Sequence, residues 1–116
     1  MRILKFRLWN NIVNNYSQNF RCTNRSVNGI LILEINEDFV PEQFTGLTDK
    51  NGTEIYEGDI VKGWLNGDEP AYTLPVYYNK EEARFELKLS ASTWPLSHMM
   101  DPKIVGNIHQ NGELLK

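Results

Sequence analysis

Cysteine and long apolar runs are both scarce in this 116-residue chain, and each shortage excludes a class of protein. Cys22 is the single cysteine, so no internal disulfide can form and folding does not require an oxidising compartment. The longest apolar run, residues 30–33, is far shorter than the roughly 20 residues that span a bilayer. The first eleven residues mix charges into their apolar stretch and lack a cleavage site for a signal peptide. We therefore expect a cytoplasmic protein.

Patterns typical of metal or cofactor sites are also missing. His98 and His109 are the two histidines, and together with one cysteine they show no spacing typical of zinc ligands. The segment that begins at Asp49 does not match a calcium-binding loop, because Ile60 occupies the twelfth position, where such a loop has a bidentate glutamate. Surface positions are expected for both histidines, and there is no glycine-rich phosphate loop. The sequence predicts no metal, no cofactor and no enzymatic activity.

Charge is small in total but uneven along the chain. The net charge is −3, yet residues 1–33 contain five basic residues and no acid, while residues 34–116 contain seven bases and fifteen acids. This asymmetry indicates either a basic face for an anionic partner or a basic part that docks on the acidic part, within one chain or between chains. We favour docking.

Short alternating segments separated by turn residues are typical of a mainly β protein. Residues 2–9 predict a half-buried strand with Leu4, Phe6 and Leu8 on one face, and residues 36–43 predict a join that includes one helical turn. Five short, bent strands between residues 43 and 110 favour a small SH3-like barrel. We expect an N-terminal strand unit over 1–40 and a barrel over 41–116, as two parts or as one compact domain. The other predicted strands cover residues 16–22, 30–35, 53–56, 59–64, 71–78, 84–89 and 103–109.

Residues 45–64 contain the densest turn chemistry. Asp49, Asn51 and Gly52 predict a tight hairpin loop, because aspartate accepts backbone hydrogen bonds, asparagine tolerates unusual torsions and glycine adopts positive φ without strain. Gly58 is expected at a bulge or sharp bend where a Cβ would clash, and Asp59 is expected to cap backbone donors there. A carboxylate pair for acid–base chemistry is the alternative interpretation of the acids in this stretch.

Four more local expectations concern the second half of the chain. Pro75 predicts an edge strand or a bulge, and Gly106 predicts a bulge. Residues 90–102 are expected to be irregular, with Trp94, Leu96 and Met99 folding back onto the core. Asn111 predicts the N-cap of a last helical turn whose leucines, Leu114 and Leu115, pack down.

Two surfaces are candidates for binding. Lys5, Arg7 and Trp9 share a predicted strand face that combines positive charge with a stacking ring, which suits nucleic acid, although the acidic chain argues against it. Five aromatic residues are too many for one small core, so they either form an exposed patch for a protein partner or wrap the barrel ends: Tyr56, Trp64, Tyr72, Tyr77 and Trp94. We expect a non-catalytic module that binds a protein or itself, with nucleic-acid binding through the N-terminal strand as the alternative.

Three stretches of the sequence resemble the signature blocks of the YopX-like phage proteins. They are KFRLW at 5–9, QFTGLTDKNGTEIYEGDIVKG at 43–63 and VGNIHQNGELL at 105–115. The resemblance implies a small protein encoded by a bacteriophage or prophage, with a β-rich fold and a barrel-like C-terminal part. It implies no activity and no ligand residues, because the family is uncharacterised. Phe44 and Gly112 depart from the tyrosine and proline usual in the family, and Gly112 predicts a looser terminal turn.

Overall fold

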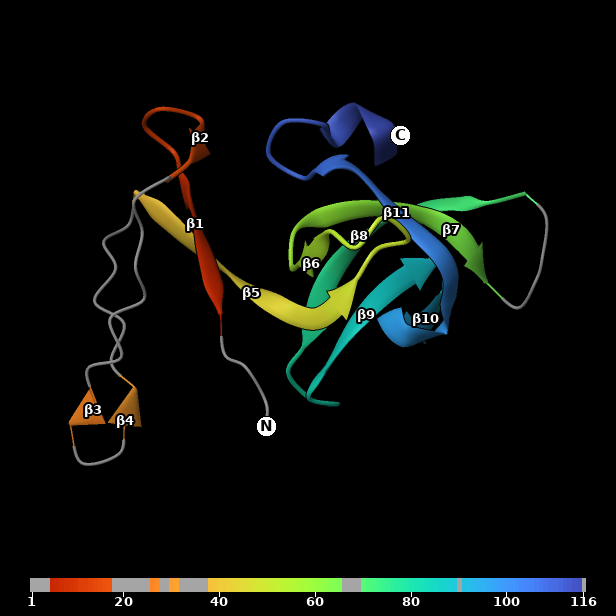
Figure 1. Cartoon of the computed structure of the whole chain (residues 1–116), viewed down its shortest axis with the longest axis horizontal. Helices are drawn as coiled ribbons and strands as arrows, with labels where there is room; N and C mark the ends of the chain where they lie inside the picture. Colours follow the sequence, from red (N-terminus) through yellow and green to blue (C-terminus); the bar gives the residue numbers. More distant parts are fainter. Residues whose placement is uncertain are drawn as a thin grey trace.

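The fold is almost entirely β, as predicted. The computed structural model describes residues 5–17, 26–27, 30–31, 38–65, 70–89 and 91–115. Within these residues two antiparallel sheets account for most of the chain (Figure 1), and no helix is long and apolar enough to cross a bilayer. The elements are β1 (Phe6–Asn10), β2 (Asn15–Tyr16), β3 (Ser26–Val27), β4 (Ile30–Leu31), β5 (Phe39–Thr48), β6 (Glu54–Tyr56), β7 (Asp59–Leu65), β8 (Tyr72–Asn79), β9 (Arg84–Leu89), β10 (Ser92–Pro95), the 3-10 helix η1 (Leu96–His98), β11 (Met99–Asn107) and the 3-10 helix η2 (Gly112–Leu115).

The five-stranded sheet, in the order β10–β9–β8–β7–β11, curls into a half-barrel around the apolar core. Alternate residues of its strands point inward because strand side chains have a period of two. Leu96 and Met99 are buried in the same core and Trp94 packs against it, which confirms the predicted fold-back. The architecture is that of the small β-barrel expected from the sequence. The buried core consists of Ile55, Val61, Leu65, Leu74, Val76, Leu87, Leu96 and Met99.

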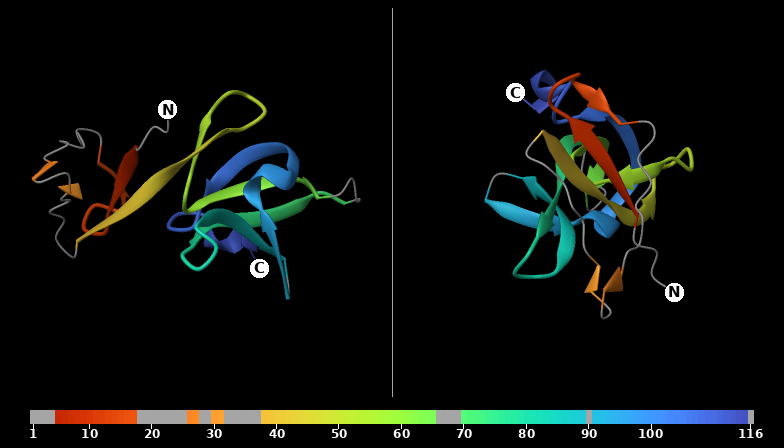
Figure 2. Two further views of the ribbon diagram at one scale, coloured as in Figure 1. Left: turned by 90° about the horizontal axis from the view of Figure 1, so that it is seen from below. Right: turned by 90° about the vertical axis from the view of Figure 1, so that its left-hand side faces the viewer.

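Strand β5 joins a smaller sheet, in the order β2–β1–β5–β6, to the barrel. Its first half pairs antiparallel with β1, and its second half pairs with β6. Figure 2 shows it running from the N-terminal sheet into the barrel. The helical turn predicted within 36–43 is therefore wrong for residues 39–43. The predicted boundary between residues 40 and 41 lies inside this strand.

The described residues from 39 to 107 form seven strands rather than the predicted five. Strand β10 was missed because its sequence, STWP, is short and contains a proline. It pairs with β9 at the edge of the sheet, where Pro95 lies opposite Glu86 and its missing N–H is not needed by a second neighbour. Residues 92–102 are thus ordered into β10, η1 and the start of β11, and the expectation of an irregular segment is wrong for them.

Pro75 lies in an interior strand, not at an edge. Strand β8 pairs with β7 over Tyr72–Pro75 and with β9 over Val76–Asn79, so it changes partner at this proline. The missing N–H therefore falls where one ladder ends and the other begins. The bulge predicted at Gly106 is confirmed by a register shift between Ile104 and Gly106.

The two ends of the chain match the predictions in part. Strand β1 confirms the predicted first strand, and β2 is the described beginning of the second. Residues 18–25, which include Arg21, Cys22 and Arg25, lie outside the described residues, as do residues 32–35 of the predicted third strand. Strand β3 lies between the predicted second and third strands and pairs with β4 in a small hairpin.

The C-terminal segment differs from its prediction in two ways. The Asn111 side chain accepts a hydrogen bond from the Asn107 N–H at 3.1 Å instead of capping η2. Leu114 and Leu115 remain 41% and 39% exposed, so they do not pack down.

Candidate functional site

The predicted hairpin loop at residues 49–53 is confirmed, and Asp49 is its centre. One carboxylate oxygen accepts the N–H groups of Asn51 and Thr53, both at 2.9 Å, and the other accepts the Ile104 N–H at 3.2 Å. Gly52 has φ +84°, the left-handed conformation for which glycine was expected. Burial opposes ionisation, but these backbone donors hold the pKa of Asp49 below its ordinary value. The side chain therefore shapes the loop and fastens it to β11.

Asp49→Asn is expected to lower the free energy of unfolding by about 1–3 kcal/mol at pH 7, because a neutral amide replaces a charged acceptor. The folded-state pKa of Asp49 is depressed, so its stabilising contribution is complete above the unfolded pKa and is lost as pH falls through the folded pKa. Urea unfolding of both proteins between pH 7 and pH 3 checks this. The difference between them should shrink below about pH 4, and a difference that stays constant would contradict the assignment.

The bend at Gly58 is also confirmed. Gly58 has φ +89°, and a Cβ at this position would overlap the Glu42 carboxylate. Asp59 accepts the Tyr56 N–H at 2.7 Å and so caps the bend as predicted. Backbone hydrogen bonds from Glu57 to Gln43 and from Gly58 to Val76 hold the turn between the two sheets.

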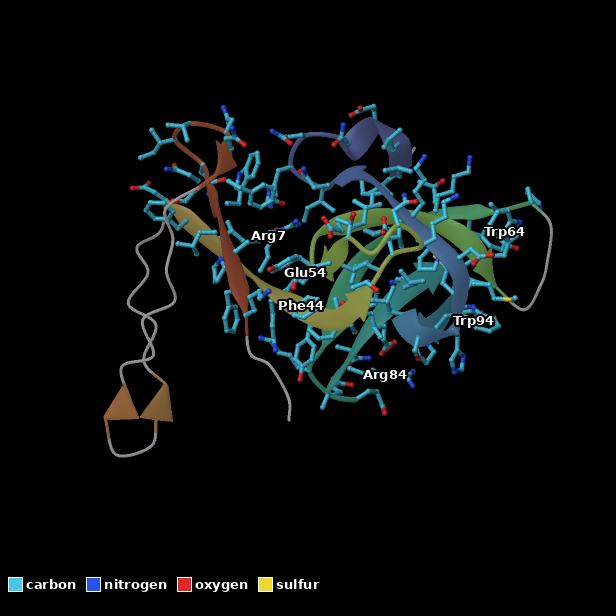
Figure 3. The ribbon with its side chains drawn as sticks, viewed as in Figure 1. Arg7, Phe44, Glu54, Trp64, Arg84 and Trp94 are labelled. Atoms are coloured by element: carbon cyan, nitrogen blue, oxygen red, sulfur yellow. The ribbon has the colours of Figure 1, made fainter. Side chains whose placement is uncertain are left out.

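Arg7 connects the N-terminal sheet to this bend (Figure 3). Its Nε donates to Glu42 at 2.8 Å, and its Nη2 lies 2.9 Å from Asp59. The guanidinium also lies over the rings of Tyr16 and Tyr56, with its central carbon 4.2 and 4.9 Å from their centroids. Burial opposes the charged form, but Asp59 and Glu42 raise the pKa of Arg7 further. Burial also raises the pKa of Asp59, so the ion pair does not fully offset the cost of removing this carboxylate from water.

Glu42 is buried and serves three donors. Besides Arg7, it accepts the Tyr16 hydroxyl at 2.9 Å, and its second oxygen lies 2.8 Å from His109 Nε2. Burial raises the pKa of Tyr16, which keeps the phenol protonated as a donor. His109, whose side chain is 17% exposed, is thus part of a partly buried network, and its expected surface position is wrong. We call Arg7, Tyr16, Glu42, Asp59 and His109 the ion network.

Trp9 covers one side of the ion network and is only 3% exposed. Its ring stacks on His109 with centroids 4.3 Å apart and planes 6° from parallel, and its Nε1 donates to Asn11 at 3.0 Å. Both faces of β1 are therefore covered at this point. The indole that nucleic-acid binding, the alternative interpretation, would use as a stacking surface is instead packed inside the protein.

The basic N-terminal strand is paired with acids from later in the chain. Lys5 Nζ lies 2.6 Å from Glu54 on the surface, and Arg7 is held by Glu42 and Asp59. Tyr56 is partly buried beneath Arg7, with its ring 5.6 Å from that of Phe44. For Lys5 and Arg7, docking within one chain is thus the correct interpretation of the uneven charge.

Glu42 and His109 form an acid–base pair within the ion network, and among the described residues no serine, threonine or cysteine side chain forms a hydrogen bond with its members. Within the described ranges, no three His, Cys, Asp or Glu side chains are grouped as a metal site would require. Each polar atom of Glu42 is engaged with a neighbouring side chain. The arrangement is suited to bracing two sheets against each other.

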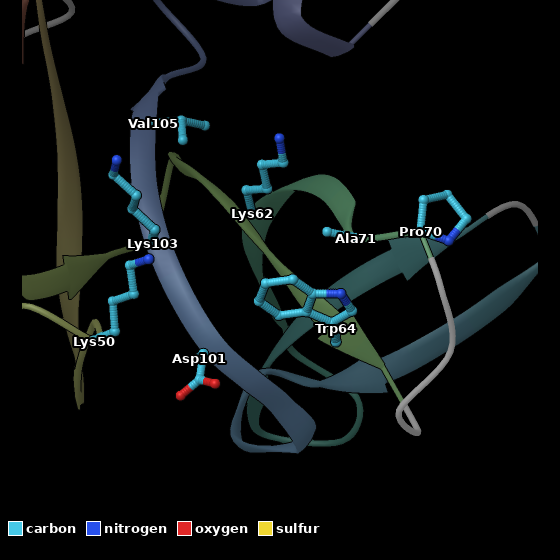
Figure 4. Close-up of a pocket in the computed structure, with 8 residues that line it drawn as sticks. All are labelled: Lys50, Lys62, Trp64, Pro70, Ala71, Asp101, Lys103 and Val105. Carbon is cyan, nitrogen blue, oxygen red and sulfur yellow. The ribbon is translucent and has the colours of Figure 1, made fainter.

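A second feature lies on the outer face of β7 and β11. A groove of about 530 Å³ is lined by Trp64 from β7 and by three lysines (Figure 4). Trp64 was predicted from the sequence as a candidate binding residue, whereas the three lysines, which are far apart in the chain, were not. We call this the lysine groove. Its lining is Lys50, Lys62, Trp64, Pro70, Ala71, Asp101, Lys103 and Val105.

Comparison with known proteins places the chain in a family. No curated protein matches it. Among solved structures, protein EF1440 from Enterococcus faecalis is 26% identical, with a TM-score of 0.62 over 98% of this chain and 99% of that chain. Protein yopX from Bacillus subtilis, at 18% identity, shares the fold with a TM-score of 0.59 over 96% of this chain and 97% of that chain. The family described as YopX protein matches residues 5–116, and the chain therefore belongs to the YopX family.

Proposed function

We propose that this chain is a non-catalytic module of a bacteriophage or prophage that binds a protein, either a partner or a second copy of itself, in the host cytoplasm. The observation that carries the proposal is a group of exposed aliphatic side chains at one side of the molecule. Ile12 and Val13, at the turn between β1 and β2, are 69% and 64% exposed. Exposed apolar residues that gather on one surface are typical of an interaction site.

The C-terminal segment extends this surface. The side-chain amide of Gln110 donates to the Asn14 carbonyl at 3.4 Å, which ties the segment to the β1–β2 turn. Figure 1 and the right-hand view of Figure 2 place the turn and η2 along the same edge of the molecule, with the turn at the N-terminal sheet and η2 beside the barrel. We call Ile12, Val13, Ile108, Leu114 and Leu115 the aliphatic surface; all five are exposed.

The aromatic residues first considered as anchors are less suited to this role. Tyr56, Trp64, Tyr72, Tyr77 and Trp94 are all partly buried. Tyr72 and Trp94 pack against the core, which supports the alternative that these rings wrap the barrel. The pairing of Lys5 and Arg7 with acids argues in the same way against nucleic-acid binding through the N-terminal strand.

A double variant, Ile12→Lys with Val13→Lys, is expected to weaken binding at least tenfold without changing the melting temperature, because both side chains are exposed in the monomer. Analytical ultracentrifugation over a range of concentrations measures self-association. If the chain is monomeric, affinity capture from host cells followed by mass spectrometry measures the loss of specific partners. Leu47→Lys is the matched control, since Leu47 is an exposed aliphatic residue outside the aliphatic surface. The proposal fails if neither assay separates the double variant from this control.

A further inference from the structure

We propose that the lysine groove binds a nucleotide, with the phosphate on its lysines and the base against Trp64. This site goes beyond the proposed protein-binding function. It lies on the outer face of β7 and β11, whereas the aliphatic surface includes the β1–β2 turn at the other end of the long axis (Figures 1 and 3).

Two lysines of the groove form an unfavourable pair of like charges. Lys62 in β7 and Lys103 in β11 are direct cross-strand partners, and both are exposed. Like charges directly opposite each other in an antiparallel pair are destabilising. Neither lysine forms a salt bridge within the part of the chain that the structure describes. The fold thus concentrates positive charge here in a chain whose net charge is negative, and a bound phosphate would relieve the repulsion.

The third lysine is brought to the groove by the hairpin loop. The Lys50 N–H donates to the Pro102 carbonyl at 2.8 Å, beside the bond from the Ile104 N–H to Asp49. These two contacts fasten residues 49 and 50 to β11 and place Lys50 among the groove-lining residues. The charge cluster is therefore built from three separate segments of the chain: the hairpin loop, β7 and β11.

Trp64 supplies the flat apolar surface that a base requires. It lies two residues after Lys62, so both side chains project from the same face of β7. The indole is partly exposed, and its Nε1 is buried without a hydrogen-bond partner among the described residues. An aromatic ring beside phosphate-binding lysines is the usual platform for stacking a base. The volume of about 530 Å³ lies within the range of small-ligand sites.

The wall of the groove contains a strained residue. Asp101 has φ +49° and lies in the register shift of β11 between Met100 and Lys103. Strain of this kind in a non-glycine residue is concentrated at functional sites, and bulges re-aim side chains toward them. The Asp101 carboxylate would repel a phosphate placed next to it but would accept a hydrogen bond from a sugar hydroxyl or a base amino group. The groove therefore suits a whole nucleotide better than a bare phosphate.

The nucleotide has two possible sources, a free mononucleotide or a single-stranded nucleic acid. The test uses AMP, the decamer dA10 and inorganic phosphate as probes, and it follows binding by isothermal titration calorimetry at low salt. We expect AMP or dA10 to bind at least tenfold more tightly than phosphate. If AMP binds and dA10 does not, the ligand is a free mononucleotide. If dA10 binds more tightly than AMP, the ligand is a single-stranded nucleic acid. For a single-stranded nucleic acid held by three lysines, the logarithm of the binding constant should fall with the logarithm of the salt concentration with a slope of about −2.

Lys62→Gln with Lys103→Gln should weaken binding at least tenfold and leave the melting temperature unchanged or higher, because the repulsion between the lysines is removed. Trp64→Leu should weaken the binding of AMP or dA10 but not the binding of phosphate. Lys80→Gln with Lys88→Gln is the charge-matched control, since both lysines are exposed and lie outside the groove. The proposal is overturned if neither AMP nor dA10 binds at millimolar concentration, if phosphate binds as well as they do, or if the control weakens binding equally. None of these outcomes bears on the aliphatic surface, which the probes do not contact.

Discussion

Glu42→Leu is expected to lower the free energy of unfolding by about 3–5 kcal/mol. The leucine would leave the half-buried guanidinium of Arg7 without one of its two carboxylates and would remove the acceptor of the Tyr16 hydroxyl and the partner of His109. Breaking one side of a buried ion pair costs far more than the pair contributes, because the remaining charge stays in a poor environment. Urea unfolding followed by circular dichroism measures the change.

Two control variants separate the possible causes of this loss. Glu42→Gln keeps one carbonyl acceptor in nearly the same shape but removes the charge and replaces the second oxygen with an NH2 donor, so it should cost less than Glu42→Leu. Glu54→Gln removes the acid of the exposed pair with Lys5 and should change stability little, because exposed ion pairs contribute little. If Glu42→Leu were no more destabilising than Glu54→Gln, the ion network would not brace the fold.

Gly58→Ala is expected to be the second most damaging change, and Gly52 provides its matched control. Both glycines have nearly the same positive φ, +89° and +84°. A Cβ at Gly52 would meet open space, whereas one at Gly58 would overlap the Glu42 carboxylate. Gly52→Ala should therefore cost only the left-handed strain of about 1–2 kcal/mol.

Gly58→Ala should cost the same strain plus about 1–3 kcal/mol for displacing a packed side chain. The comparison uses urea unfolding under one set of conditions for both variants. Equal losses would show that Glu42 moves aside freely, which is incompatible with its three hydrogen bonds. A larger loss at Gly58 would confirm that this glycine is required by a close approach as well as by its torsion.

Several features that depend on neighbouring residues were predictable from the sequence. The loop at Asp49 and Gly52, the bend at Gly58 with its cap from Asp59, and the bulge at Gly106 all follow from local backbone chemistry. The mainly β class follows from alternation with a period of two. In each case the residues that decide the structure lie within a few positions of one another.

Features that depend on distant partners were not predictable. The side chains of Arg7, Glu42 and His109 meet because β5 pairs with β1 and because the segment after β11 returns to this sheet, and neither event has a local signal. Only the uneven charge indicated that the basic part meets acids. Lys62 and Lys103 face each other through a strand register with a bulge, which a single sequence does not reveal.

The claim that the basic N-terminal strand serves to attach one sheet to the other is tested most directly by a double-mutant cycle between Arg7 and Asp59, which join β1 to β7 at 2.9 Å. Arg7→Met, Asp59→Asn and the combined variant are compared with the wild type by urea unfolding at pH 7. A coupling energy of about 2 kcal/mol is expected, because each single change leaves the other charge poorly compensated while the double change leaves neither. A coupling energy below about 0.5 kcal/mol, within the range of independent sites, would contradict the claim.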